Sequence, residues 1–286
     1  MKIAHLILAH SDPQQLGRLI DRLQHKDAYF FVHIDKKTAI EPFTFLAAKQ
    51  QVYLLENRVD VQWGAYSIVQ ATINGFREIV DSGLKIGYVN LLSGADYPLK
   101  RTEEIHQFFE TNKGQLFMEF YSVANEWKEA IPRLTEYHLT NYSFPGKYHV
   151  QKWLNRLTPV RKMPDKLVAV GRSQWFSIPT EAVRYILDYL KSHPEVQRFF
   201  KLTWAPDEII FQTILFNSKW KEKMVNNNLR YIVWGQGKAS PDIFTEKNES
   251  ELFASEALFA RKFAMLKYPE ILDALDRKDQ VKPSGR

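Results

Sequence analysis

The chain has 286 residues, of which 45% are hydrophobic and 14% aromatic, and it carries a formal net charge of +6 with no cysteine. Without cysteine, disulfide bonds and zinc sites built on thiolates are excluded. The positive charge favours anionic ligands such as nucleotides, but the Lys and Arg residues are dispersed and form no motif for binding nucleic acid. The start of the chain is unlike a signal peptide, and no stretch of ~18 apolar residues is present to span a membrane. We therefore expect a soluble, cytoplasmic protein.

The first third of the sequence alternates between strand and helix patterns. In chain order the patterns predict strand 3–9, helix 13–23, strands 29–34 and 52–55, helix 65–80 and strand 86–92. This alternation is typical of an α/β fold with a doubly wound, mainly parallel sheet and helices on both faces. Ligands of such sheets bind beyond the carboxyl ends of the strands, which here lead into residues 33–37 and 93–100.

The middle of the chain, residues 122–164, is polar, aromatic and basic, and its periodicity is weak. We expect an irregular insertion with short helices, of the kind that covers an active site. The patterns after it predict strand 173–178, helix 180–191, a helix after Pro206, strand 231–234, helices 249–263 and 269–278, and a frayed tail over 280–286. No repeat or linker divides the chain, so we expect a single domain.

Two adjacent acids, Asp207 and Glu208, follow Pro206 at the start of an apolar stretch that runs to Phe216. Proline suits the first turn of a helix, and acids in that turn interact favourably with the positive end of the helix dipole. Both acids could therefore simply stabilise the start of a helix. The alternative is that one of them is a catalytic base at the edge of a pocket.

One acid and three cations are candidates for binding a nucleotide. Asp35 ends the second expected strand, where a carboxylate can accept hydrogen bonds from ribose hydroxyls or a uracil N–H, unless it is only a solvated turn acid. The sequence has no Asp-x-Asp pair, with which many nucleotide-sugar transferases hold Mn²⁺ or Mg²⁺ against a diphosphate. Side chains would then have to neutralise the diphosphate. The candidates are Arg230, Arg261 and Lys262, each of which could also be a surface cation.

Seven short segments occur in an order and with a spacing typical of one domain. They are VHIDKK (32–37), VQWGAYS (61–67), NLLSGADYPLK (90–100), SQWF (173–176), PDE (206–208), RYIVW (230–234) and LFARKF (258–263). With these segments the chain resembles the core-2/I-branching N-acetylglucosaminyltransferase family, which also includes the proteoglycan xylosyltransferases. The resemblance implies a GT-A-like fold and an inverting, metal-independent transfer from a UDP-sugar to a glycan hydroxyl, with no cofactor.

The resemblance also implies roles for individual residues. Glu208 matches the general base of the branching enzymes, and Asp207 is left as a structural acid. The donor would be bound by Asp35 and Trp63 at the uridine, by Arg230, Arg261 and Lys262 at the diphosphate, and by Asp96. Trp175, Trp204 and Arg133 are the expected acceptor-binding residues. On this basis residues 1–121 form a nucleotide-binding half, 122–164 the insertion, 165–268 an acceptor and diphosphate half, and 269–286 a C-terminal helix and tail.

The donor sugar is not fixed by the resemblance. The xylosyltransferases carry an acid at the position of Gln174, whose amide cannot act as a base; this favours Glu208 as the base and UDP-N-acetylglucosamine as the donor. The alternatives are a UDP-xylose-dependent enzyme of the same family and a non-catalytic glycan- or nucleotide-binding module. The eukaryotic members are anchored in the Golgi and rich in cysteine, so this chain is closer to a bacterial-type enzyme. Its acceptor would be a glycan or lipid-linked glycan, and its basic, aromatic insertion could contact an anionic membrane surface at the cytoplasmic face.

Overall fold

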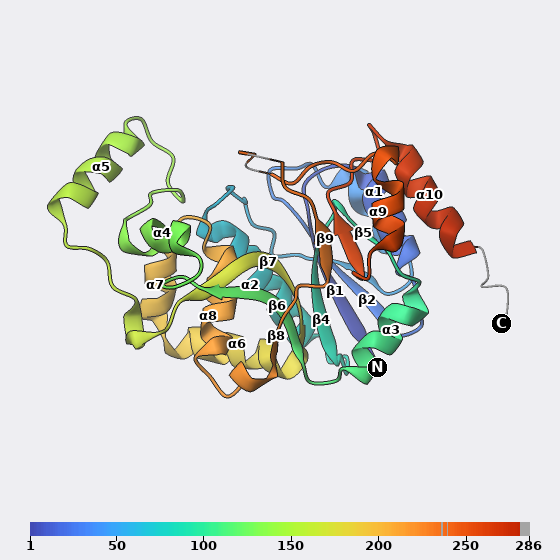
Figure 1. The fold of residues 1–286 in the computed structure, drawn as a ribbon, viewed down its shortest axis with the longest axis horizontal. Coiled ribbons are helices and arrows are strands. Elements are labelled where there is room, and N and C mark those ends of the chain that lie inside the picture. The colour runs from blue at the N-terminus through green and yellow to red at the C-terminus, as the bar shows by residue number, and fades with distance from the viewer. Residues whose placement is uncertain (236, 239, 281–286) are drawn as a thin grey trace.

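A seven-stranded sheet runs through the centre of the computed structural model, which describes residues 1–280 except 236 and 239 (Figure 1). The strand order is β3-β2-β1-β4-β7-β6-β8. Strands β1 to β4 pair in parallel, β7 runs antiparallel to both β4 and β6, and β8 is parallel to β6. The strands are β1 Ile3–Ala9, β2 Ala28–Ile34, β3 Val52–Leu54, β4 Tyr88–Ser93, β6 Leu116–Ser122, β7 Val170–Pro179 and β8 Met224–Asn226. The predicted mainly parallel α/β sheet of a GT-A-like fold is thus confirmed.

Helices cover both faces of this sheet, as predicted for a doubly wound fold. The helices are α1 Pro13–Arg22, α2 Tyr66–Asp81, α3 Thr102–Thr111, α4 Ile131–Thr135, α5 Lys147–Leu157, α6 Thr180–Ser192, α7 Pro194–Lys201, α8 Ile210–Phe216, α9 Glu249–Ala254 and α10 Pro269–Gln280. One apolar core lies against α2, α6 and α8, and a second lies against α1, α3 and α10. Strands β1, β2 and β4 contribute to both cores because alternate side chains point to opposite faces.

A second, three-stranded sheet is formed by described residues from distant parts of the chain: β5 Asp96–Pro98, β10 Phe259–Arg261 and β9 Arg230–Ile232. Strand β10 lies in the middle, antiparallel to β5 and parallel to β9. This corrects the prediction of a helix over 249–263, since only its first six residues form a helix. The ladder hydrogen bonds available between β5 and β9 outweigh the local helical pattern.

The segment after Pro206 also differs from the prediction of one continuous helix. Pro206–Glu208 forms a short 3-10 turn, and α8 begins only at Ile210 after Ile209 adopts a non-helical conformation. No described side chain caps either element. Asp207 and Glu208 therefore lie in the first turn of this 3-10 helix and not in the first turn of α8.

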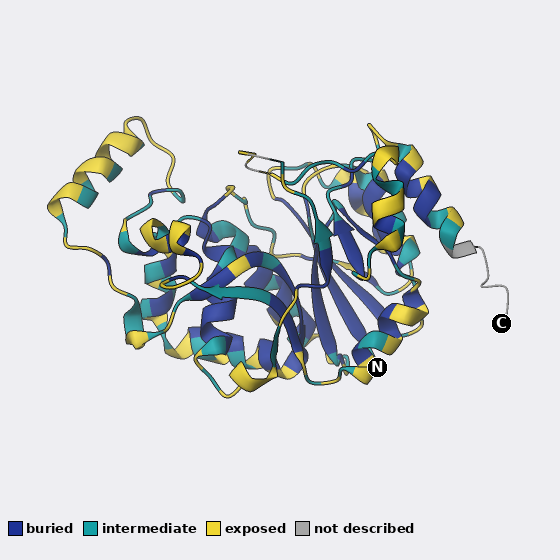
Figure 2. Cartoon of the chain, in the orientation of Figure 1, coloured by how far each residue is buried: buried dark blue, intermediate teal, exposed yellow. Residues whose placement is uncertain are grey.

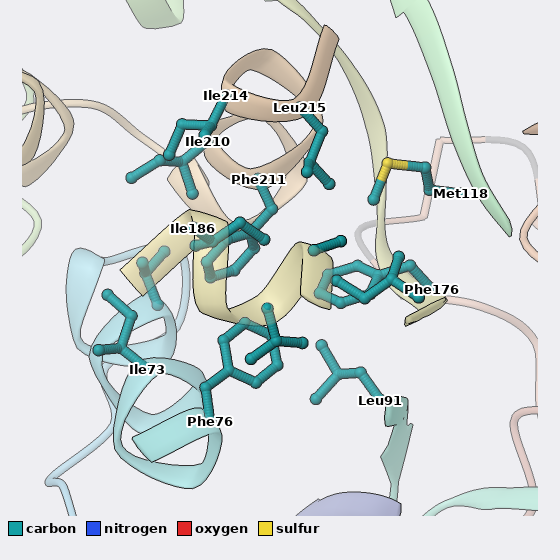
Figure 3. Packing of buried hydrophobic residues seen from close by; sticks show 14 of the residues in the cluster. Ile73, Phe76, Leu91, Met118, Phe176, Ile186, Ile210, Phe211, Ile214 and Leu215 are labelled. Carbon is teal, nitrogen blue, oxygen red and sulfur yellow. The ribbon is translucent and has the colours of Figure 1, made fainter. Parts of the chain in front are cut away.

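Three phenylalanine rings fix α8 to the sheet (Figure 3). Phe211 of α8 lies edge-on to Phe76 of α2 at 5.7 Å and to Phe176 of β7 at 5.6 Å between ring centroids. Burial of one such ring stabilises the fold by roughly 1.5–3 kcal/mol, and edge-to-face pairs add to this. The turn that carries Glu208 is thus attached to a rigid element directly beside β7.

The insertion contains two short helices, α4 and α5, joined by irregular segments. Beyond it the chain returns to the sheet through β7, and α10 closes the C-terminal side (Figure 1). Of the tail predicted to be frayed, residues 281–286 lie outside the described residues. In the part of the chain that the structure describes, every helix is too short or too polar to cross a bilayer.

Candidate active site

The carboxyl ends of β1, β2 and β4 meet at one edge of the main sheet. There the backbone N–H of Asp35 donates to the carbonyl of Ala9 at 2.8 Å, and that of Gly94 donates to Leu8 at 2.9 Å. Asp35 and the 93–96 turn therefore lie at the same edge, where ligands of doubly wound sheets bind. The predicted site residues are distributed along this edge.

The carboxylate of Asp35 is nearly buried and is tied to the loop that follows β3. Its Oδ1 accepts hydrogen bonds from the backbone N–H of Lys37 at 2.9 Å and of Val61 at 3.4 Å. Arg58, which the sequence did not single out, donates to the carbonyls of Ile34 and Asp35 at 2.9 and 2.8 Å. These bonds hold the loop with Trp63 over the sheet edge.

Trp63 and Trp204 form an edge-to-face pair with ring centroids 5.6 Å apart. Trp63 is 65% exposed, so most of its ring faces solvent. Gly64 between them has a φ of +68°, and a Cβ there would lie 2.7 Å from the indole nitrogen of Trp204. Its carbonyl accepts a hydrogen bond from Ala205 at 2.8 Å, which links this loop to the turn that carries Glu208.

Glu208 is paired with Arg133 of the insertion. Nη1 of Arg133 lies 2.5 Å from Oε2 of Glu208, and both side chains are largely shielded from solvent. The guanidinium carbon lies 4.7 Å from the ring centroid of Trp127 and 4.3 Å from that of Trp204. Arg133 is thus held by cation–π contacts with two indoles while it binds the carboxylate. The structure brings Arg133, Trp204 and Glu208 together as one cluster.

The two adjacent acids differ in their surroundings. Burial raises the pKa of Glu208, and the charge of Arg133 acts against that shift. Burial, with the charge of Glu208, raises the pKa of Asp207 to about 8. The buried Oδ1 of Asp207 has no hydrogen-bond partner among the described residues. Asp207 is therefore the more deeply buried of the two acids, and Glu208 is the one whose carboxylate has a guanidinium as its partner.

Glu119 and Gly171 belong to this cluster and were missed by the sequence analysis. Burial raises the pKa of Glu119 in β6, which also senses the charges of Arg172 and Glu208. A Cβ at Gly171 would lie 2.1 Å from the carbonyl oxygen of Glu208, so β7 can pass beneath the turn only with glycine. An acid within a strand and an isolated glycine carry no signal by themselves, which explains why they were missed.

Asp96 and Arg261 form a buried ion pair between β5 and β10. They are register partners in the antiparallel ladder, with Nη1 of Arg261 lying 2.8 Å from Oδ1 of Asp96. Oδ2 of Asp96 accepts a hydrogen bond from the backbone of Ser93 at 3.0 Å. The guanidinium also lies 4.5 Å from the ring centroid of Trp175. Trp175, expected to bind the acceptor, is buried beneath Arg261.

Arg230 is buried and its guanidinium is turned into the sheet. Its Nη2 donates to Oδ1 of Asn90 at 2.5 Å and to the carbonyl of Leu91 at 2.8 Å, and its Nη1 donates to Ser177 at 3.3 Å. Burial lowers the pKa of this guanidinium to about 10. Arg230 therefore binds residues within β4 and β7, whereas the sequence predicts that it meets a diphosphate.

Lys262 lines a cavity of about 530 Å³ next to the second sheet. Two further lysines, Lys238 and Lys267, line the same cavity, together with Asp242 and Tyr268. Burial, with the charge of Arg261, lowers the pKa of Lys262. Lys238 is paired with Asp242 in this lining, so the cations that it offers an anionic ligand are chiefly Lys262 and Lys267. Lys238 and Lys267 were not predicted, because neither lies in a segment of family resemblance.

The described residues contain no group of three or more His, Asp or Glu side chains arranged to hold a metal ion. They form one group of a carboxylate, a guanidinium and two exposed or half-exposed indoles, and, beside the second sheet, a lysine-lined cavity. This arrangement can accept a proton at Glu208 and bind an anion at Lys262. It has the parts needed for a transfer reaction with an anionic leaving group.

Comparison with known proteins gives one family and several relatives. A family model described as Core-2/I-Branching enzyme matches residues 3–255. Xylosyltransferase 2 of Rattus norvegicus is 25% identical over 303 aligned residues, which cover 96% of this chain and 33% of that protein. Xylosyltransferase 1 of the same species is 24% identical, with 96% and 35% covered. The chain thus spans about a third of the length of these relatives.

Among solved structures, the galactosyltransferase LgtC in complex with donor and acceptor sugar analogues superposes with a TM-score of 0.48 and 8% identity, over 96% of this chain and 95% of that one. The family match includes the whole main sheet and the cluster around Glu208, and it ends just after α9, before Arg261 and Lys262. Because it takes in most of the sequence, this chain belongs to the Core-2/I-branching enzyme family.

Proposed function

We propose that this protein is an inverting, metal-independent glycosyltransferase that uses a UDP-sugar donor and Glu208 as its general base. The observation that supports this most directly is the ion pair of Glu208 with Arg133, held by cation–π contacts with Trp127 and Trp204. The pair lies at the sheet edge that also carries Asp35.

In this proposal Glu208 takes the proton of the acceptor hydroxyl. The acceptor oxygen forms a bond to the anomeric carbon as the bond from that carbon to the diphosphate oxygen breaks, and UDP leaves with the bonding electrons. Attack from the face opposite UDP inverts the anomeric configuration. A positioned base typically accelerates such a step by roughly 10²–10⁴-fold.

The leaving diphosphate would be stabilised by side-chain cations. Lys262, Lys238 and Lys267 line one cavity, and Arg261, which precedes Lys262 in the chain, pairs with Asp96. Fixed cations placed where negative charge develops lower the barrier because they need no reorganisation. We assign Arg230 a supporting role, because its hydrogen bonds to Asn90 and Ser177 hold the strands beneath this region.

The indoles suit a glycan acceptor. Trp63 presents a largely exposed ring, and Trp204 beside it contacts Arg133, so a sugar stacked there would lie next to Glu208. Aromatic rings bind the apolar faces of sugars with a fixed geometry. The family resemblance implies that Trp63 contacts the uridine of the donor. Because Trp63 packs on Trp204, the proposal assigns it to the acceptor instead.

The donor sugar is proposed to be N-acetylglucosamine, with xylose as the second candidate. Gln174 stands where the xylosyltransferases have an acid, which supports the first, and the names of the curated relatives support the second. A panel of UDP-sugars, assayed for UDP release with glycan acceptors in the presence of a chelator, separates them. We expect turnover with UDP-N-acetylglucosamine that the chelator does not reduce. Strict dependence on Mn²⁺ would overturn the metal-free mechanism, and binding of UDP without turnover would favour a non-catalytic module.

Replacing Arg133 by Gln should shift the pH dependence of transfer. Arg133 opposes the rise that burial causes in the pKa of Glu208, so its loss should raise that pKa further. Glu208 would then be deprotonated only at higher pH, and the acidic limb of the kcat profile should move to higher pH. Replacing the exposed Lys201 on α7 by Gln serves as the control. An unchanged acidic limb in the Arg133 variant would show that the pair does not set the ionisation of the base.

A further inference from the structure

Helix α5 stands out from the body of the protein at one end of its long axis (Figure 1). All of its residues are described, and none of them is buried; Figure 2 shows the helix almost wholly exposed. A surface helix normally turns an apolar stripe toward the core. Helix α5 instead turns polar residues toward the protein and apolar residues toward solvent.

The side of α5 that faces the protein is polar. Oδ1 of Asn155 accepts a hydrogen bond from the backbone N–H of Tyr137 at 2.7 Å, and its Nδ2 donates to the Tyr137 carbonyl at 3.0 Å. One turn earlier, Oε1 of Gln151 accepts from the backbone N–H of Leu139 at 2.9 Å. Residues four apart share a helix face, so these two amides fix which side of α5 points inward.

The apolar side chains lie on the other side and point outward. Val150, Trp153 and Leu157 follow one another at spacings of three and four residues, which places them on one face. They are 48%, 58% and 75% exposed. The exposed Arg156 lies beside this face, with its guanidinium 5.9 Å from the ring of Trp153. The exposed Lys152 lies one turn earlier on the border with the polar side, where it lines a cavity with Gln151 and Asn155. The outward set, Val150, Trp153 and Leu157, together with the two cations at its border, Lys152 and Arg156, is called the α5 face below.

The charge of the surrounding segment indicates what the α5 face meets. No Asp or Glu occurs between Glu136 and Asp165, while basic residues recur throughout that stretch. An anionic bilayer complements both features, since apolar side chains enter the boundary of the acyl chains and cations meet the headgroups. Trp in particular favours the membrane interface. A second copy of the chain would instead place the same cations against one another.

We propose that the α5 face docks this protein onto a lipid bilayer of negative surface charge. The helix lies in the plane of the interface, with Trp153 and Leu157 inserted and Lys152 and Arg156 at the headgroups. The inference is independent of the proposed transfer reaction, since it involves no donor-site residue. Failure of one therefore leaves the other intact.

The test is co-sedimentation of the full chain with phosphatidylcholine vesicles prepared with and without phosphatidylglycerol. We expect binding only to the anionic vesicles and weaker binding at high salt, because salt screens the headgroup contacts. The double variant Lys152→Gln/Arg156→Gln should bind about thirtyfold more weakly. The double variant Trp153→Ser/Leu157→Ser should lose binding, because its apolar contacts are gone.

Two matched variants control for unspecific effects. Leu266→Ser removes an equally exposed leucine, 82% accessible, from another part of the surface. Lys85→Gln/Lys113→Gln removes two exposed cations away from the insertion. Both should bind like the unaltered protein. The proposal is overturned if the unaltered protein does not bind anionic vesicles, if the control variants weaken binding as much as the α5 variants, or if Trp153→Ser/Leu157→Ser converts a dimer to a monomer without changing vesicle binding.

Discussion

Replacing Glu208 by Gln should lower the turnover of glycosyl transfer by roughly 10²–10⁴-fold, the usual contribution of a positioned general base. Gln has the shape of Glu and can still accept a hydrogen bond from Arg133, so the fold and the stacked indoles should be kept. Donor binding should change little, because the cations around Lys262 are untouched. The measurements are kcat with saturating UDP-sugar and acceptor, and the Kd of UDP from calorimetry.

Two neighbouring acids provide the controls for this variant. Asp207→Asn removes the adjacent carboxyl, which makes no side-chain contact with Arg133, and we expect it to retain most of the turnover. Glu119→Gln removes the other acid that interacts with Glu208. If Glu119→Gln abolishes transfer while Glu208→Gln does not, the base has been assigned to the wrong carboxylate. Equal losses in all three variants would point to a structural effect of charge in this cluster.

Replacing Asp96 by Ala should reduce the free energy of unfolding by about 3–5 kcal/mol, as is typical when one partner of a buried ion pair is removed. The side chain of Asp96 is fully buried, and that of Arg261 is only 12% exposed. The variant would leave the Arg261 charge without its carboxylate inside the contact between β5 and β10. Urea unfolding followed by far-UV circular dichroism measures the loss.

A double-variant cycle distinguishes the lost pair from other effects of the substitution. Asp96→Ala combined with Arg261→Met removes both charges, and it should be more stable than Asp96→Ala alone. Asp21→Ala breaks the more exposed pair of Asp21 with Lys49 and should cost about 1 kcal/mol or less. A loss of that small size in Asp96→Ala, or a double variant that is less stable than either single variant, would contradict the argument.

Hydrophobic patterns along the chain were sufficient to predict the strands of the first half of the main sheet and most of the helices that cover it. Strands β1, β2 and β4 are mostly apolar runs because both of their faces are buried in the sheet. Such runs are easily recognised as buried strands, so the sequence predicts them with small errors at their ends. The pattern failed at 249–263, where β10 forms between β5 and β9. It also failed after Pro206, where two short elements replace one helix. In both places contacts with distant segments override the local preference.

For the candidate site, the sequence identified which charged residues to consider, but it did not show which residues each of them contacts. The sequence selects Glu208 from two adjacent acids only through a family resemblance, whereas the structure separates them by the contact of Glu208 with Arg133 and by the burial of Asp207. Arg230 and Arg261 look equivalent as isolated cations. Only the fold shows that the first is turned into the sheet and the second lies beside Asp96.

By itself, then, the sequence determined the α/β class, the sheet edge at which the site lies and the family, because these depend on periodicity and on short ordered segments. The tertiary structure decided which charges are paired, which indoles are exposed and which way α5 faces. Arg133 and Glu208 are 75 residues apart, and Asp96 and Arg261 are 165 apart. Pairings over such separations are set by how the layers pack, and no local pattern encodes them.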